Sequence, residues 1–434
     1  MHAETQRKDT NQTKPEPTNG DIGWHAGRFL VGRQEIGASD PGFAQAIRDA
    51  HESHQRPRCL CTPEGVEMYI ARYGSDHIVK RMPDTGHCHA SQCSSFEPPA
   101  SWSGLAPLIG HAIREDPRTG ETQLNVDFSL SQRAARQGNS DAHCDARESS
   151  AASSAGATRM SLGCLLQYLW DQAELTRWHA GFAGKRTWST VRRMLLHAAE
   201  FKQVRGQALL THLFIPESFS VERREEIDAR RLAHWNQLRR ARRPRPLMLL
   251  IAELKDLMPG RFGYQAVVKH MPDQAWVLQE PLFRRLERRF QTELTLWSSS
   301  PELRQLMIGA FWVSEAGVPT LESLSLMPVT PEWLPVEDRQ DLHLLHELLT
   351  ARRSFIKSQR YRLPRTAPSA SAILTDTGRS PIPLYIDRST SQDQPSALGC
   401  TGTTLHGGSD GWCWRLSSGT MPTLPSANPC FRQT

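Results

Sequence analysis

Apolar residues recur at helical spacing after residue 160 of the chain. Leu162, Leu165, Leu166 and Leu169 follow the i, i+3, i+4, i+7 pattern, which lines one face of a helix. This pattern predicts a helix over 161–177.

Two more helices are expected before residue 244. One follows Thr187 or Ser189, whose hydroxyl oxygens could cap a helix N-terminus. The other spans 221–243 and is charged and rich in arginine. Pro244 and Pro246 end it, because proline lacks the amide donor that a helix requires.

The pattern changes period beyond these prolines. Residues 247–251 form a short apolar run bounded by prolines and charge, as expected of a buried strand. Runs of strand length follow at 306–313, 321–327, 372–375 and 384–386, and stretches of helical length lie at 281–296 and 336–356. This mixture predicts an α+β fold with a mixed α/β domain in the C-terminal half.

Composition marks the borders of this organisation. Residues 1–27, 129–158 and those beyond 388 are polar or rich in small residues, and such segments bury too little apolar surface to offset their ordering entropy. The expected organisation is a disordered tail (1–27), an N-terminal domain (28–128) containing a Cys/His hairpin module (58–96), a flexible linker (129–158), a helical basic segment (159–245), an α/β domain (246–388) and a low-complexity tail (389–434).

Charge and hydropathy exclude two classes of protein. The chain has 52 Lys and Arg against 46 Asp and Glu, and the net charge of +6 is too small for a polycation of the histone type. Any nucleic-acid site must therefore be a local patch. No apolar run approaches the roughly 18 residues of a membrane span, and the N-terminus has no apolar signal region. We therefore expect a cytoplasmic protein without membrane partners.

The cysteines carry the clearest chemistry. Cys59 and Cys61 are separated from His89 and Cys93 by residues 66–82, which predict a strand, a tight turn and a second strand. Such a hairpin would carry both ligand groups to the same end. Tetrahedral Zn²⁺ takes four nitrogen or sulfur donors, and these four residues supply such a set. The sequence thus predicts a structural zinc site in a small zinc-ribbon-like β-hairpin module.

Alternatives to this ligand set stay open in the sequence. His87 or Cys88 could replace His89 as a ligand, and the thiols could instead be reduced, partly buried small hydrophobic residues. A catalytic metal would need an open coordination position and an acid–base partner. Glu64, Glu67 and Asp84 have no recognised spacing for that role.

The cysteine module also carries a family resemblance. Residues 58–61, 68–69, 80–83 and 89–93 resemble those of a bacterial family of unknown function that is marked by N-terminal cysteines. Members of that family are often encoded on plasmids and integrative elements, and the similarity runs from about residue 58 to 386. The resemblance supplies no reaction. It implies work linked to DNA, by analogy alone.

An arginine cluster is the candidate for nucleic-acid contact. Residues 222–245 hold nine Arg against four acidic residues, an excess of +5. Guanidinium groups bind phosphates bidentately and stack on bases, so the candidate contact residues are Arg239, Arg240, Arg242 and Arg243. The alternative is a solvated helix in which early acids pair with later arginines at i,i+4 spacing.

The C-terminal half suggests an enzyme as a competing hypothesis. A helix over 336–359, a strand ending in Asp376 and another ending at Asp387 are similar to the restriction-endonuclease-like core, in which acids bind Mg²⁺. An acid such as Glu337 or Glu347 would have to converge with both aspartates. The other interpretation is that residues 376–378 form a turn between strands.

The leading hypothesis combines these signals. It is a bacterial mobile-element protein with a structural zinc module that acts as a nucleic-acid-associated accessory factor, with DNA or RNA and other mobile-element proteins as partners. The alternatives are a metal-dependent nuclease and a protein–protein adaptor whose docking hairpin is stabilised by zinc.

Overall fold

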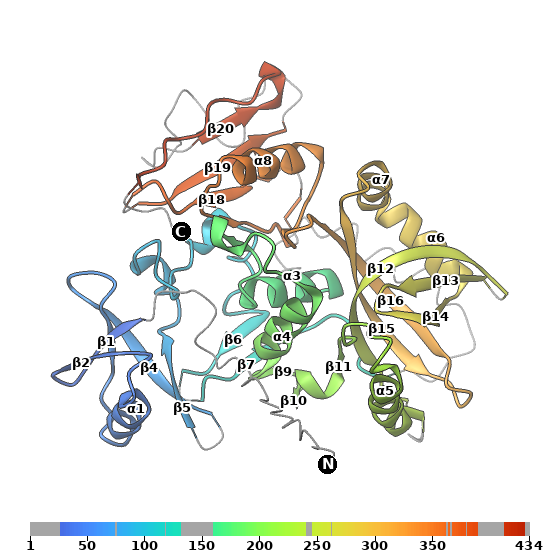
Figure 1. The fold of residues 1–434 in the computed structure, drawn as a ribbon, viewed down its shortest axis with the longest axis horizontal. Coiled ribbons are helices and arrows are strands. Elements are labelled where there is room, and N and C mark those ends of the chain that lie inside the picture. The colour runs from blue at the N-terminus through green and yellow to red at the C-terminus, as the bar shows by residue number, and fades with distance from the viewer. Residues whose placement is uncertain are drawn as a thin grey trace, which may run out of the picture. The chain divides into compact units, whose positions relative to one another are not determined.

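A computed structural model gives the fold (Figure 1). The structure describes residues 27–73, 76–117, 119–131, 159–239, 245–261, 263–361, 363–364, 367–378, 380–388 and 412–429. Most of the expected N-terminal tail and linker therefore lies outside the described residues. The chain forms two compact units, the first comprising the residues up to Met82 together with Cys93–Ser95, and the second comprising the rest.

The first unit is a five-stranded antiparallel sheet with one helix. The strand order is β2-β1-β3-β4-β5, and α1 packs on the sheet through Ile47 and Ala50, which contact Ile70. The elements are β1 (Arg28–Val31), β2 (Gln34–Gly37), α1 (Phe43–Glu52), β3 (Arg58–Cys59), β4 (Val66–Tyr73) and β5 (Asp76–Arg81). The hairpin expected from residues 66–82 is the pair β4–β5.

The second unit begins with a small sheet covered by two helices. The strand order is β10-β9-β7-β6. The elements are β6 (Ile113–Glu115), β7 (Thr122–Leu124), α3 (Leu162–Gln172), α4 (Trp188–Ala199), β9 (Lys202–Val204) and β10 (Gln207–Ala208). The hydroxyl of Thr187 accepts a hydrogen bond from the Thr190 amide, as expected of the N-cap of α4. Leu165 and Leu169 are fully buried, so α3 packs through the apolar face that the spacing predicted.

A closed five-stranded barrel follows in the same unit. β12 pairs with both β13 and β15, which closes the sheet β12-β13-β14-β16-β15, and β11 adds to β12 in parallel. Its elements are β11 (Leu213–Phe214), α5 (Arg224–Arg239), β12 (Met248–Gly260), β13 (Gly263–Val268), β14 (Met271–Leu278), α6 (Glu280–Arg289), α7 (Gln291–Ser299), β15 (Arg304–Val313) and β16 (Pro319–Val329). Trp276 and Phe311 fill the barrel core, where Trp235 of α5 packs against them.

A third sheet of the second unit lies under one helix. The strand order is β20-β19-β18-β17-β8, and α8 contributes Leu344, Leu345 and Leu348 to the core. The elements are β8 (Arg177–Trp178), α8 (Arg339–Thr350), β17 (Phe355–Lys357), β18 (Ala372–Leu374), β19 (Ile382–Asp387) and β20 (Trp412–Arg415). β20 belongs to the stretch that composition assigned to a low-complexity tail.

The structure confirms the α+β class, with differences in element lengths. The single helix expected over 281–296 is two helices, because the helix is interrupted at Phe290. The helix expected over 336–356 ends at Thr350. Arg352 then takes a positive φ of 52°, which stops a helix, and Phe355–Lys357 form a strand. None of the described helices combines the length and apolarity needed to cross a lipid bilayer.

Candidate metal centre

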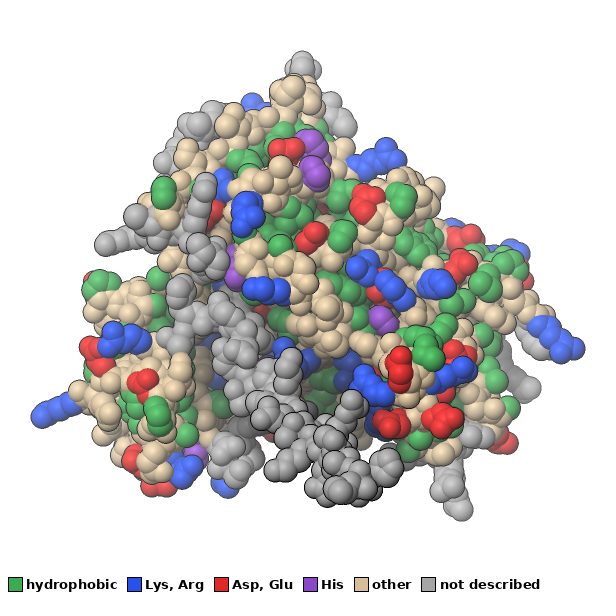
Figure 2. All heavy atoms as spheres, in the orientation of Figure 1, with side chains coloured by type: hydrophobic (Ala, Val, Ile, Leu, Met, Phe, Trp, Pro, Cys, Tyr) green, Lys and Arg blue, Asp and Glu red, His purple; other side chains and the backbone are tan. Residues whose placement is uncertain are grey.

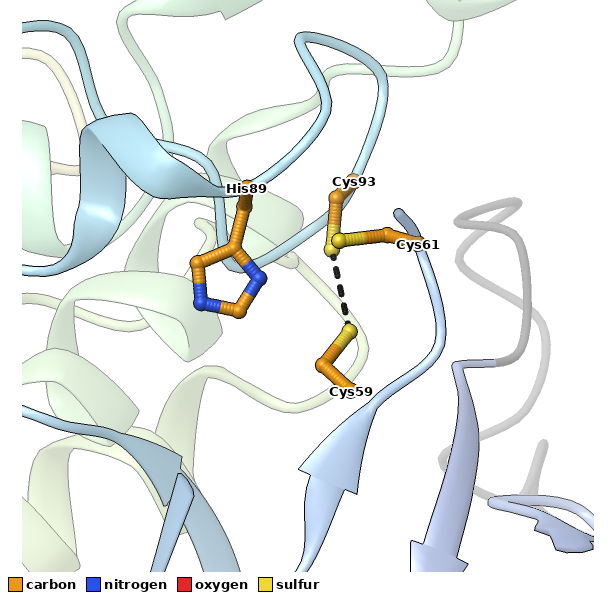
Figure 3. Close-up of side chains that lie close together, drawn as sticks. All are labelled: Cys59, Cys61, His89 and Cys93. Atoms are coloured by element: carbon orange, nitrogen blue, oxygen red, sulfur yellow. Dashed lines mark hydrogen bonds between the residues drawn. The ribbon is translucent and has the colours of Figure 1, made fainter. Parts of the chain in front are cut away.

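Four side chains with metal-binding atoms converge beside the end of β3, the central strand of the first sheet. The ligand atoms of Cys59, Cys61, His89 and Cys93 all lie within 4.8 Å of one another, and the Sγ atoms of Cys59 and Cys93 are 3.7 Å apart. Figure 3 shows the imidazole and the three sulfur atoms directed toward one common space. No other described residues bring three or more Cys, His, Asp or Glu side chains close enough to share a metal ion.

Strand β3 positions the two cysteines that come first in the chain. Cys59 pairs with Phe29 of β1 on one side and with Val66 of β4 on the other. Cys61 lies in the turn that directly follows β3, two residues beyond Cys59. Arg58 closes the following turn by donating from Nη2 to the carbonyl oxygens of Glu64 and Gly65.

A compact loop carries the other two ligands. The short helix Gly86–Cys88 ends at His89, and Gly86 lies so close to Glu97 that an added Cβ would come within 2.7 Å of the Glu97 Cβ. The Ser91 hydroxyl lies 3.3 Å from the carbonyl oxygens of both Thr375 and Gly378, which anchors the loop. The Ser95 amide donates to the Cys93 Sγ at 3.4 Å, a bond that favours a thiolate.

Burial and neighbouring thiols raise the pKa of one ligand of the cluster, Cys59. Cys59 and His89 are only 2% and 4% exposed. The hydrogen bond with the Cys61 thiol, the one with Cys93, and burial together raise the pKa of the Cys59 thiol. The Cys59 thiol therefore keeps its proton when no cation is bound, whereas a bound cation reverses this preference and holds it as a thiolate.

The geometry fits a tetrahedral ion bound by four protein atoms. Zn–S bonds of about 2.3 Å in a tetrahedron place two sulfur atoms about 3.8 Å apart, and the observed Cys59–Cys93 separation is 3.7 Å. Four protein donors fill a tetrahedral site, so no position is left for water or substrate. The arrangement suits a structural ion rather than a catalytic one.

Comparison with known proteins places this site in a family. The sequence model of a family described as a protein of unknown function, DUF1173, matches residues 29–417. The chain belongs to the DUF1173 family. The matched region includes all four clustered residues, and the expected resemblance to a family of unknown function is confirmed. No curated protein gives a match, and no solved structure does either.

The structure also distinguishes among the ligand alternatives in this DUF1173 protein. His89 lies in the cluster, whereas His87 and Cys88 are exposed. Of the nearby acids, Glu67 pairs with Arg56 at 2.5 Å. Glu64 and Asp84 are exposed and belong to no described group that could hold a metal ion.

Three arginines in the first half of α5, Arg224, Arg230 and Arg231, are paired with acids. Arg224 contacts Asp273 at 3.0 Å, Arg230 contacts Glu217 at 2.8 Å, and Arg231 contacts Asp228 at 2.9 Å. Figure 2 shows acidic and basic side chains interspersed over α5. Arg239 is the last residue of the helix, and Arg240, Arg242 and Arg243 lie outside the described residues.

The aspartates of the nuclease hypothesis do not gather into a metal site. Asp376 is fully buried and accepts two hydrogen bonds from Arg353, at 2.7 and 2.9 Å, and one from the Ser354 amide at 2.9 Å. Asp387 does not share a metal-binding group with it in the part of the chain that the structure describes. The carboxylate of Asp376 is therefore engaged in a buried ion pair with Arg353 instead of being open to a metal ion.

Sequence reasoning missed the dense ionic contacts of the second unit. Lys357 and Asp341 are both fully buried with 3.3 Å between Nζ and Oδ2, and burial raises the pKa of Asp341 to about 6. Glu253 of β12 contacts Lys269 and Arg304. The partners are 16 to 51 residues apart in the chain, so no local spacing could have revealed them.

Proposed function

We propose that Cys59, Cys61, His89 and Cys93 bind one structural zinc ion. The observation that carries this proposal is their convergence within 4.8 Å, in a set of three sulfur donors and one nitrogen donor. A borderline-soft ion with no geometric preference of its own suits such a set. The bound ion would supply folding free energy by holding the loop that contains His89 and Cys93 next to β3.

We further propose that this DUF1173 protein is a cytoplasmic, nucleic-acid-associated accessory factor of a mobile element. The acids that pair with α5 arginines all lie at or before residue 228, apart from Asp273. Residues 229–245 contain seven arginines and no acid. This supports phosphate contacts at Arg239, Arg240, Arg242 and Arg243, with DNA or RNA and other mobile-element proteins as partners.

Metal content tests the first proposal. Purified full-length protein should contain about one zinc ion per chain by elemental mass spectrometry. Cys59→Ser and Cys93→Ser should abolish this content, whereas Cys88→Ser should retain it, because Cys88 is exposed outside the cluster. Equal zinc in Cys93→Ser and wild type would contradict the proposed site.

Oligonucleotide binding at several salt concentrations tests the second proposal. Each phosphate contact on a single strand contributes about 0.7 to the slope of log affinity against log salt concentration. Replacing Arg239, Arg240, Arg242 and Arg243 by Ala should flatten that slope. A zinc-loaded protein that binds no DNA or RNA would instead favour the adaptor hypothesis. Mg²⁺-dependent cleavage of plasmid DNA that is lost in Asp376→Asn, with the fold intact, would favour the nuclease.

A further inference from the structure

The barrel of the second unit has a recognisable strand order. β12, β13 and β14 form an antiparallel meander, β14 pairs in parallel with β16, and β15 lies antiparallel between β16 and β12. Helices α6 and α7 lie between the third and fourth strands of the barrel. This order and helix position are those of the OB-fold, a five-stranded barrel that many oligonucleotide-binding proteins share. Fold alone does not assign a ligand, so the surface chemistry must decide.

Apart from Asp273, which pairs with Arg224, the outer face of β13 and β14 carries no charged side chain. Ala266, Val268, Trp276 and Leu278 point into the barrel core, so the alternating positions 265, 267, 275 and 277 point outward. These positions carry Gln, Val, Ala and Val. They offer neither a cation for a phosphate nor an aromatic ring for a base. A polyanion must therefore be held by another part of the barrel.

A group of cations lies at the turn between the same two strands. Lys269 of this turn donates to Oε1 of Glu253 at 2.8 Å, and Arg304 of β15 donates to the same oxygen at 3.2 Å. The Glu253 side chain is 7% exposed, whereas those of Lys269 and Arg304 are 45% and 31% exposed. One buried carboxylate thus holds two partly exposed cations close enough together to contact a single phosphate group.

The surroundings hold these cations in place and leave them with excess charge. The Arg304 guanidinium lies 4.7 Å from the ring centre of Trp333, which is fixed between Arg304 and Trp188. His270 stacks on Trp188 with 5.0 Å between ring centres. Burial lowers the pKa of His270 to about 4, so this side chain is neutral near pH 7. Two positive charges therefore meet one negative charge.

We propose that Lys269 and Arg304 form a phosphate-binding site on the barrel, positioned by Glu253. Most of their donors remain available, because an ammonium group has three N–H bonds and a guanidinium has five. The ligand is a phosphodiester of a single-stranded nucleic acid, and this identification rests on the proposed nucleic-acid association.

Two probes and two variants test the site in the full-length protein. Binding of inorganic phosphate is measured by the rise in the thermal unfolding temperature. Binding of labelled single-stranded DNA and RNA is measured by fluorescence anisotropy. Lys269→Ala should weaken oligonucleotide binding about threefold to tenfold and lower the salt slope by about 0.7. Lys269→Glu should weaken binding further and abolish the thermal shift caused by phosphate. Arg284→Ala is the matched control, because Arg284 is 71% exposed and paired with Glu280.

The outcomes separate this site from the proposed function. Oligonucleotide binding that is equal in wild type and Lys269→Glu would overturn the site and leave the nucleic-acid association standing. Phosphate could raise the unfolding temperature of wild type but not of Lys269→Glu, while neither protein binds an oligonucleotide. That result would support the phosphate site and reject the nucleic-acid association. If phosphate raises the unfolding temperature equally in wild type and Lys269→Glu, the proposed site is wrong, both for free phosphate and for the phosphates of a nucleic acid.

Discussion

Cys59 and Cys93 are 34 residues apart in the chain, yet their Sγ atoms lie 3.7 Å apart. β3 fixes Cys59 within the first sheet, and the Ser95 amide contacts the sulfur of Cys93. Two thiols held at this separation are spaced for ligation of one tetrahedral ion.

Removal of the metal should destabilise the protein. A chelator stronger than the site should lower the free energy of unfolding by several kcal/mol, because binding free energy at a structural zinc site is folding free energy. Urea titrations with and without chelator would measure this loss. Zinc added back should restore stability in wild type and Cys88→Ser but not in Cys59→Ser.

The buried pair of Arg353 and Asp376 should be among the most sensitive sites of the second unit. Asp376→Asn should lower the free energy of unfolding by about 3 kcal/mol or more, because an uncompensated guanidinium then stays buried. Chemical denaturation would measure the loss. The exposed pair of Arg284 and Glu280 is the comparison, and Glu280→Gln should cost no more than about 0.5 kcal/mol.

Acid should weaken the fold through His270. Its pKa falls from 6.5 to about 4 in the folded chain because burial penalises the charged ring. The unfolded chain thus takes up this proton first, and stability present above pH 6.5 is lost as the pH falls toward 4. At about 1.4 kcal/mol per pKa unit, the loss reaches about 3 kcal/mol. Denaturation of wild type and His270→Gln across this range should show a flatter profile in the variant, and parallel profiles would contradict the assignment.

Gly104 should not tolerate a side chain. A Cβ at this position would lie 1.9 Å from the carbonyl oxygen of Arg360, a backbone atom that cannot rotate away. Gly104→Ala should therefore destabilise the protein by about 2 kcal/mol or more, as overpacking does. Gly42→Ala provides the control, since its nearest contact is the Ile36 Cδ1 at 3.8 Å. Thermal unfolding of the two variants would compare them.

Local patterns in the sequence predicted the helices and the convergence of the ligands. The leucine spacing after residue 160 predicted the helix α3. The C-x-C spacing, followed by a hairpin, indicated how the four ligand side chains could come together. Sequence could not choose among His87, Cys88 and His89, because the choice depends on where the short helix Gly86–Cys88 ends.

Contacts between distant residues explain what sequence missed. Closure of the barrel needs Ile251 of β12 opposite Ile308 of β15, a pairing that no local pattern encodes. The apolar stretches of β13 and β14 are short and are interrupted by Gln265 and by residues 272–274, so they gave no clear strand signal. The group around Glu253 forms only after this closure, because Lys269 and Arg304 come from different parts of the barrel.

The pairing of β20 with β19 bears on how the chain can be shortened. Trp412 and Trp414 are buried in the core beneath this sheet, and β20 covers the backbone of Ile386 and Asp387. A protein truncated after Arg388 would leave β19 as an open edge beside an uncovered apolar surface. Open edges pair with strands of other chains, so this truncation should favour aggregation during expression.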